Sequence, residues 1–198
     1  MKKQLIISVG REFGSGGHLI AEELSKRFNL KLYDNNLLLE IAEKHGSDSE
    51  VLKRFDEMPK SRILSRTVRG YNNSPEDIIT QMQFDYMREK AEEGESFVIV
   101  GRCAETVLKG HPALVSIFVL GDYEKKLERI SEKYALSQKD AKSLIKTTDK
   151  KRKSYHNYNC ELHWGDSRLY EVSINSSRLG IDGTVDILET YIKKRIGE

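Results

Sequence analysis

The sequence predicts an α/β fold in which a five-stranded parallel sheet carries helices on both faces. Short apolar runs alternate along the chain with segments of helical periodicity, and this alternation is typical of parallel sheets. The runs are almost continuously apolar, as expected for strands that are buried on both faces. The predicted strands are Leu5–Val9, Lys31–Tyr33, Phe97–Val100, Leu114–Leu120 and Tyr170–Ile174.

The first strand leads into a glycine-rich turn at Gly10–Gly17. An amphipathic helix follows, in which Ile20, Leu24 and Phe28 recur every four residues and therefore share one face. After the second strand, residues 37–41 continue in another helical pattern.

Residues 46–74 are polar and show no clean period, so we interpret them as a small lobe inserted into the domain. The segment Ser74–Asp77 combines a serine N-cap, a proline at the first helical position and two acidic residues in the first turn. It predicts a helix that runs to about Glu93.

Three further helices are predicted in the C-terminal half. Asp122 is placed to cap a helix that runs to about Tyr134, and Ser137 with Asp140 begins a second, strongly basic helix. The last helix is predicted over Val185–Ile196.

Composition and charge exclude several classes of protein. The 198 residues contain no internal repeat or long Gly/Ser linker, so we expect a single domain over residues 1–198. The 33 basic and 31 acidic side chains leave a net charge of +2, which argues against a protein that coats nucleic acid. The longest apolar stretches fall far short of the roughly 20 residues that a membrane helix needs.

The start of the chain and its cysteines indicate the cellular compartment in which we expect the protein. The apolar stretch after Gln4 is too short for the core of a signal peptide. Two cysteines, Cys103 and Cys160, do not form a disulfide framework. We therefore expect a soluble, cytoplasmic protein with reduced thiols.

Residues with unusual chemistry follow three of the predicted strands. Gly10–His18 come after the first strand, Asp34 after the second and Arg102 after the third. Ligands of parallel sheets bind beyond the carboxyl ends of the strands. This clustering predicts a ligand site at that edge.

The turn Gly14-Ser15-Gly16-Gly17 has the layout of a phosphate-binding loop. Glycines bring several backbone N–H groups close to one anion, and the N-terminus of the next helix adds positive potential. The common pattern ends in Gly-Lys-Ser/Thr, whereas Gly17 and His18 stand here in place of the lysine and the hydroxyl residue. The alternative is a tight turn that binds no ligand.

Two neighbouring side chains offer replacements. Arg11 lies in the same loop and would supply the missing cation, although a solvated surface charge is an equal alternative. Ser15 would supply a hydroxyl.

The segment Ile7–Gly17, with the sequence ISVGREFGSGG, resembles the signature of the cytidylate kinase-like family, a branch of the P-loop nucleoside monophosphate kinases. Members of this branch share the Arg-Glu-Phe-Gly-Ser-Gly-Gly stretch, so the loop without lysine is a feature of the branch. The resemblance covers nearly the whole chain. The other segments that carry it are Leu32–Asn35, Phe97–Glu105, Asp149–Tyr158, Ile174–Ser177 and Leu179–Asp182.

This resemblance implies a three-layer P-loop kinase fold with an acceptor-binding lobe at about residues 46–74 and a lid at about 137–165. It implies transfer of a phosphoryl group from ATP to a nucleoside monophosphate, with CMP or dCMP as the first candidates. ATP would lie on Gly14–His18. Mg²⁺ would be held largely by phosphates and water, because His18 is a poor ligand for so hard a cation.

The resemblance also assigns the acceptor site. Arg102 corresponds to the arginine that grips the acceptor phosphate, and its planar guanidinium suits phosphate oxygens. Asp34 corresponds to the aspartate that faces the acceptor nucleotide. Cys103 replaces a ribose-binding aspartate, and Glu105 would substitute for it. From the residues alone, Arg102 is alternatively a structural ion-pair partner, Asp34 an N-cap, and Cys103 a small packed residue.

The most basic stretch of the chain runs from Lys142 to Lys153. Such a run is usually a solvated helix face. By resemblance, Asp149 and Arg152 form the Asp-x-x-Arg of the lid, in which Asp149 would bind substrate and Arg152 would neutralise charge on the transferring phosphoryl group. We favour this role for Arg152 and solvation for most of the lysines.

Two other features of this region carry less weight. His156, Cys160 and His163 have a spacing that resembles a metal site, but a fourth ligand with suitable spacing is missing, so we predict no metal site. Aromatic residues beside basic ones also stack on single-stranded nucleic acid, but the near-neutral charge disfavours such a partner.

We therefore expect a nucleoside monophosphate kinase that acts on small nucleotides, with Arg11, Arg102 and Arg152 as its catalytic cations. Gly17 and His18 motivate an alternative, a nucleotide-binding regulatory protein with little or no kinase activity. A kinase for a non-nucleotide small molecule is a third possibility, because residues 46–74 contain no base-reading pattern.

Overall fold

A computed structural model of the protein describes residues 3–34, 36–45, 67–68, 71–72 and 74–197. Most of the inserted lobe predicted at residues 46–74 therefore lies outside the described residues. Its described part contains the antiparallel strands β3 (Thr67–Val68) and β4 (Tyr71–Asn72).

A five-stranded, fully parallel sheet forms the centre of the molecule, in the strand order β2-β5-β1-β6-β7. This confirms the predicted fold class. The strand β1 lies in the middle and pairs with β5 on one side and β6 on the other, so the chain reverses its direction of travel across the sheet there. The strands are β1 (Ile6–Arg11), β2 (Lys31–Tyr33), β5 (Phe97–Val100), β6 (Leu114–Leu120) and β7 (Val172–Asn175).

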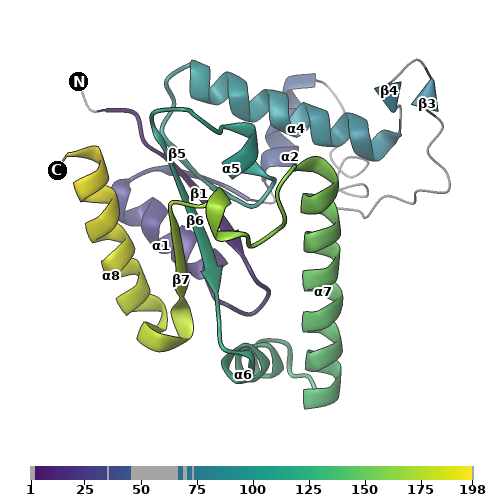
Figure 1. Ribbon diagram of the computed structural model, residues 1–198, viewed down its shortest axis with the longest axis vertical. Coiled ribbons are helices and arrows are strands. Elements are labelled where there is room, and N and C mark those ends of the chain that lie inside the picture. The colour runs from purple at the N-terminus through teal and green to yellow at the C-terminus, as the bar shows by residue number, and fades with distance from the viewer. Residues whose placement is uncertain (1–2, 35, 46–66, 69–70, 73, 198) are drawn as a thin grey trace.

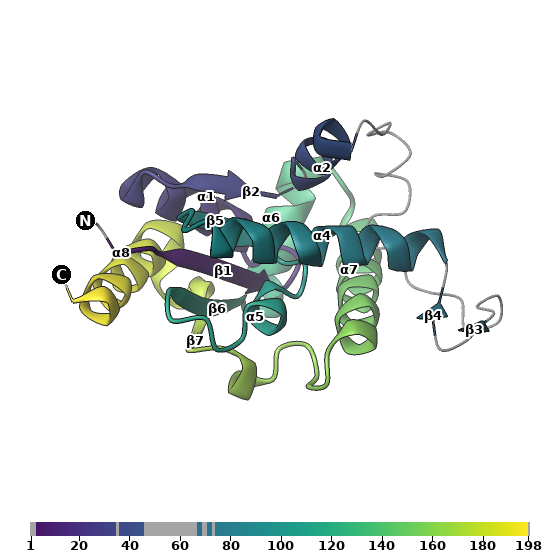
Figure 2. The same cartoon turned by 90° about the horizontal axis from the view of Figure 1, so that it is seen from above.

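Helices cover both faces of this sheet, as Figures 1 and 2 show. One face packs against α1 (Gly17–Phe28) and α8 (Ser176–Ile196), and the other against α2 (Leu37–His45), α4 (Pro75–Glu92) and α5 (Ala104–Val107). Neighbouring strand residues alternate between the two cores. Ile6 belongs to the α2–α4 side and Ile7 to the α1–α8 side, and both are fully buried.

Two more helices extend beyond the carboxyl edge of the sheet. The helices α6 (Tyr123–Tyr134) and α7 (Gln138–Asn159) pack on each other through Ile130, Ala141 and Ile145, and Phe13 from the loop after β1 joins this cluster. In Figure 1 the long helix α7 stands beside the sheet with α6 at its lower end. The basic stretch of the sequence lies on α7, and its lysines are exposed to solvent.

The predicted helix starts are confirmed where a side chain caps the backbone. The hydroxyl of Ser74 accepts a hydrogen bond from the amide of Asp77, and that of Ser137 accepts one from the amide of Asp140. Asp122 also begins its helix, but its carboxylate accepts a hydrogen bond from the side-chain amide of Asn175 at 2.7 Å instead of capping α6.

The structure differs from the predictions at three elements. The last helix begins at Ser176 instead of Val185, because Gly180 interrupts its pattern with a non-helical backbone at φ 71° and ψ −177°. The last strand begins at Val172 instead of Tyr170, which ends the 3₁₀ turn Ser167–Leu169. The helix α5 is too short, at four residues, to show a period in the sequence.

Among the described residues, every helix is either too short or too polar to cross a lipid bilayer.

Candidate active site

A cavity of about 420 Å³ opens at the carboxyl edge of the sheet, beside the end of β1. This is the size range of small-molecule sites, and its place at the reversal of strand order is the usual one in parallel sheets. Most of the residues singled out in the sequence line this cavity. These are Arg11, Gly14, Gly16, Gly17, His18, Asp34, Arg102 and Arg152.

The glycine-rich loop forms the floor of this cavity. Gly14 and Gly16 have φ angles of 83° and 82°, a left-handed backbone that glycine adopts without strain. Gly16 is also the N-cap of α1 and, because it has no side chain, it makes no side-chain capping hydrogen bond. Gly16, Gly17 and His18 all line the cavity, and the N-terminus of α1 therefore faces it.

The side chain of Arg11 occupies the space that a lysine after the loop would need. A Cβ atom added at Gly17 would come within 2.5 Å of the Arg11 Cβ and 3.3 Å of the Val119 Cβ. A Cβ atom at Gly101 would collide with the Arg11 Nη1. The arginine therefore crosses from the end of β1, over Gly17, to the loop after β5.

Basic side chains outnumber acidic ones around the cavity. Among its described lining residues, the carboxylates are those of Glu12 and Asp34, whereas the arginine and lysine side chains are Arg11, Arg102, Arg129, Lys133 and Arg152. The sequence did not predict Arg129 and Lys133, because no local pattern shows which basic residues of an amphipathic helix face a site. Arg129 donates a hydrogen bond through Nη1 to the carbonyl of Gly14.

Arg102 is a deeply buried cation, with 4% of its surface exposed. Burial, together with the nearby charge of Arg11, lowers the pKa of its guanidinium to about 10. Both effects would be relieved by an anion in the cavity, so this arrangement favours an anionic ligand.

Arg152 reaches the loop from α7. Its Nη1 donates to the carbonyl oxygen of Arg11 at 3.4 Å, and its guanidinium lies 5.5 Å from the centre of the Phe13 ring. A guanidinium at that distance from an aromatic face is in the range of a cation–π contact. These two contacts place Arg152 beside the glycine-rich loop.

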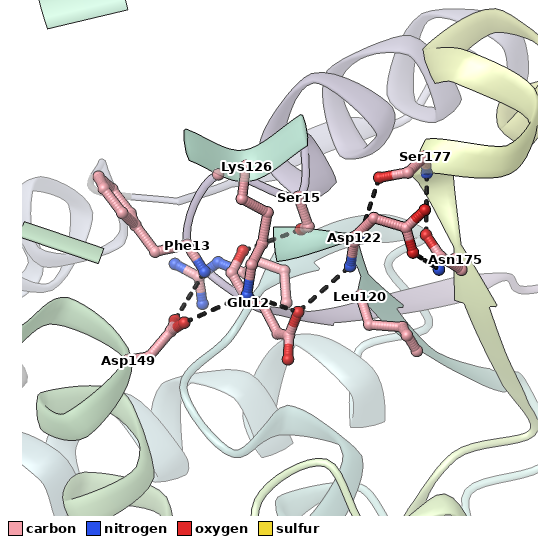
Figure 3. A network of polar contacts seen from close by, with 12 residues as sticks. Glu12, Phe13, Ser15, Leu120, Asp122, Lys126, Asp149, Asn175 and Ser177 are labelled. Atoms are coloured by element: carbon pink, nitrogen blue, oxygen red, sulfur yellow. Dashed lines mark hydrogen bonds and ion pairs between the residues drawn. The ribbon is translucent and has the colours of Figure 1, made fainter. Parts of the chain in front are cut away.

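A network of partly buried polar contacts holds the glycine-rich loop (Figure 3). The ammonium of Lys126 lies 2.9 Å from Glu12 Oε2 and 3.7 Å from Asp149 Oδ2. Asp149 Oδ1 accepts a hydrogen bond from the amide of Phe13 at 2.7 Å. Burial raises the pKa of Asp149, while Phe13 and Lys126 oppose that rise. Asp149 thus holds the loop backbone and does not line the cavity.

The hydroxyl of Ser15 points into the loop. It donates to the carbonyl of Glu12 at 2.8 Å and accepts from the amide of Gly17 at 3.3 Å, and Ser15 is fully buried. The carbonyl of Ser15 in turn accepts from the hydroxyl of Ser176 at the start of α8. The hydroxyl expected to face a ligand is used to shape the turn.

Asp34 lines the cavity, and its carboxylate also contributes to the turn before α2. Its Oδ1 accepts from the amide of Asn36 at 3.1 Å, which stabilises the turn before α2. Its Oδ2 lies 3.7 Å from His18 Nε2 across the cavity.

Glu105 lies behind Arg102, away from the main cavity. It is buried, and its Oε1 is 2.8 Å from His156 Nε2. The ribose contact expected for it is therefore not available in this arrangement. Burial lowers the pKa of His156, but Cys160 and Glu105 outweigh it and raise that pKa to about 9. Cys103, followed by His156, lowers the pKa of Cys160 to about 5 against the effect of burial.

Comparison with protein families gives one match over most of the chain. The model of the cytidylate kinase-like family matches residues 6–178. A cytidylate kinase of Methanopyrus kandleri is 24% identical to this chain, and the similarity covers 95% of this chain and 93% of that protein.

Solved structures share the fold. An uncharacterized protein from Eubacterium ventriosum is 39% identical, with a TM-score of 0.77 over 96% of this chain and 99% of that chain. A shikimate kinase from Bacteroides thetaiotaomicron has a TM-score of 0.55 at 13% identity, covering 96% of this chain and 98% of that one. A sugar kinase from Janibacter has the same TM-score at 14% identity, covering 96% and 95%. The fold is that of the P-loop kinases.

Proposed function

Because the chain belongs to the cytidylate kinase-like family, we propose that it transfers the γ-phosphoryl group of ATP to a nucleoside monophosphate, with CMP or dCMP as the acceptor. The observation that carries this proposal is the charge around the cavity of about 420 Å³, where five arginine and lysine side chains and the N-terminus of α1 surround one space. Such an environment favours a polyanion. The cytidylate kinase relative supports a cytidine nucleotide among the polyanions.

On the donor side, the phosphates of ATP would lie against the amides of Gly14–His18. Phosphoryl transfer depends on positioning and charge neutralisation and requires no nucleophile from the protein. Arg11 would neutralise the phosphates from above Gly17, in the place that a lysine has in other phosphate loops. Arg129 and Lys133 would add positive charge from α6.

On the acceptor side, Arg102 would bind the phosphate of the monophosphate, because its planar guanidinium can pair with two phosphate oxygens. Asp34 would accept hydrogen bonds from the rest of the nucleotide. Arg152 lies between the two sides, with its guanidinium near the carbonyl of Arg11, and would neutralise the charge that develops during transfer.

The residues around the cavity fit a Mg²⁺ ion that arrives with ATP. Asp34 and Glu12 are its carboxylates among the described residues, and Glu12 is already paired with Lys126. Mg²⁺ prefers oxygen ligands and keeps several waters, so Asp34 would hold it through water and His18 would not ligate it. When bound, the ion would neutralise phosphate charge.

The proposal is tested by measuring ADP formation with ATP, Mg²⁺ and each nucleoside monophosphate in turn. CMP or dCMP should give the highest kcat/KM. Arg102→Ala and Arg152→Ala should each lower it by about 100-fold or more, the cost of removing a donor that stabilises transition-state charge. Lys151→Ala is the matched control, because Lys151 is the exposed neighbour of Arg152 on α7.

Two results would contradict the proposal. Tight nucleotide binding without turnover of any monophosphate would support a regulatory nucleotide-binding protein instead. Turnover only with a phosphate-free small molecule as acceptor would keep the kinase chemistry but exclude the nucleotide acceptor.

A further inference from the structure

Three side chains that commonly bind metals meet behind Arg102, and the proposed reaction uses none of them. The sulfur atoms of Cys103 and Cys160 and a ring nitrogen of His156 all lie within 4.8 Å of one another. Cys103 and His156 are buried, and Cys160 is partly exposed at the C-cap of α7. His163, which the sequence placed beside them, lies outside this group.

The imidazole of His156 is oriented as in many metal sites. Its Nε2 lies 2.8 Å from the buried carboxylate of Glu105. Its Nδ1 is buried and makes no hydrogen bond to any group in the described part of the chain. A histidine that ligates a metal commonly donates its other N–H to a carboxylate, which fixes the tautomer. Glu105 therefore leaves Nδ1 as the nitrogen with a lone pair.

The cluster adjoins a small space. A cavity of about 20 Å³, lined in part by Cys103, Glu105 and His156, is large enough for about one water-sized atom. In a tetrahedral zinc site with Zn–S bonds of about 2.3 Å, two sulfurs lie about 3.8 Å apart. Ligand atoms within 4.8 Å of one another reach that geometry by small side-chain shifts.

We propose that Cys103, His156 and Cys160 form a site for a divalent cation of intermediate softness, for which Zn²⁺ is the best match. Two thiolates and an imidazole are ligands that zinc takes in proteins, and a water molecule completes the tetrahedron. Hard cations such as Mg²⁺ and Ca²⁺ prefer oxygen, so this donor set discriminates against them.

Such an ion would join two distant parts of the chain. Cys103 directly follows Arg102 in the loop after β5, and His156 is one helical turn beyond Arg152 on α7. A metal bound by both segments would fix these two arginines relative to each other. The metal site itself does not depend on the proposed kinase function; this consequence for the two arginines does.

The test measures metal content in the absence of nucleotide. The full-length protein, purified under reducing conditions without chelators, should contain about one zinc ion per chain. Metal-free protein titrated with Co²⁺ should develop thiolate-to-cobalt charge-transfer absorption. Cys160→Ser should lower zinc to background and abolish this absorption, and His163→Asn is the matched control that should retain both.

Three results would overturn the proposal: absence of bound zinc after incubation with one equivalent, a Co²⁺ spectrum without thiolate bands, or equal zinc in the wild type and Cys160→Ser. The Co²⁺ spectrum of the wild type needs no variant, so a failure of Cys160→Ser to fold leaves the test intact. The measurement contains no ATP or acceptor, and its failure is therefore distinguishable from failure of the kinase assay.

Discussion

At the scale of single residues, Arg11 and Gly17 depend on each other. The lysine of the common phosphate loop is absent, and a side chain at position 17 would collide with the stem of Arg11. Under the proposed function, this exchanges the lysine of the common loop for a cation that enters from the preceding strand. This exchange makes glycine a steric requirement at position 17, in addition to any role in bringing the backbone close to an anion.

We predict that Arg11→Ala lowers kcat/KM for ATP by about 100-fold, because it removes a cation aimed at the phosphates. Lys26→Ala, an exposed lysine on α1 whose side chain is 71% accessible, should leave the value unchanged. Steady-state kinetics with varied ATP checks both variants. Equal, small effects of the two substitutions would show that Arg11 is a surface charge.

The steric argument predicts a non-additive pair of substitutions. Gly17→Lys alone should impair activity and stability, since its Cβ would meet the Cβ of Arg11. In the double variant Arg11→Gly/Gly17→Lys the Cβ and Cγ atoms of residue 11 that would meet the new side chain are absent, so activity should exceed that of Arg11→Gly. If the loss of activity in the double variant equals the sum of the losses in the two single variants, the exchange of cations is refuted.

At the scale of elements, α6 and α7 position the glycine-rich loop from outside the sheet. Lys126 of α6 pairs with Glu12, and Asp149 of α7 accepts from the amide of Phe13. Asp149 was expected to bind substrate as part of a lid motif, but its contacts are with the amide of Phe13 and the ammonium of Lys126. This residue therefore joins α7 to the glycine-rich loop.

Removing the central ammonium should destabilise this arrangement. Lys126→Met would leave Glu12 and Asp149 facing each other and should lower the free energy of unfolding by about 2 kcal/mol. The expected loss of stability is smaller than that for breaking a fully buried ion pair, because the side chain of Glu12 is 29% exposed. Urea denaturation checks the value.

Lys125→Met is the matched control for that substitution. Lys125 is the adjacent, exposed residue, and its ion pair in the described part of the chain is with Glu128 on the same helix. The free energy of unfolding of the Lys125→Met variant should equal that of the wild type. If both variants unfold at the same urea concentration as the wild type, the network does not support the loop.

At the scale of the whole molecule, the sequence predicted what local patterns can encode. Continuous apolar runs located the strands, and the glycine-rich turn located the ligand edge. Contacts between segments that are distant in the sequence are not encoded in any local pattern. Lys126 under the loop, Arg129 beside Gly14 and the grouping of Cys103 with Cys160 each arise from packing between elements. Gly180 misled the prediction of α8 because a kinked helix breaks the period that reveals it.

Ligand binding at the carboxyl edge should stabilise the entire fold, because β1, α1, α6 and α7 all contribute to the cavity. A ligand that binds only the folded state adds about 2.7 kcal/mol at one hundred times its Kd. Thermal unfolding should therefore shift upward with Mg²⁺ and ATP, and adenosine, which lacks phosphates, should have no effect. An equal shift with adenosine would show that the loop amides do not bind phosphate.

The most direct measurement of the central claim follows phosphorus itself. Phosphorus-31 NMR of the protein with Mg²⁺, ATP and CMP should show ADP and CDP resonances growing in equal amounts as those of ATP and CMP disappear. Conversion of ATP to ADP and inorganic phosphate alone, or a spectrum that does not change at high enzyme concentration, would contradict phosphoryl transfer to the nucleotide in this cavity.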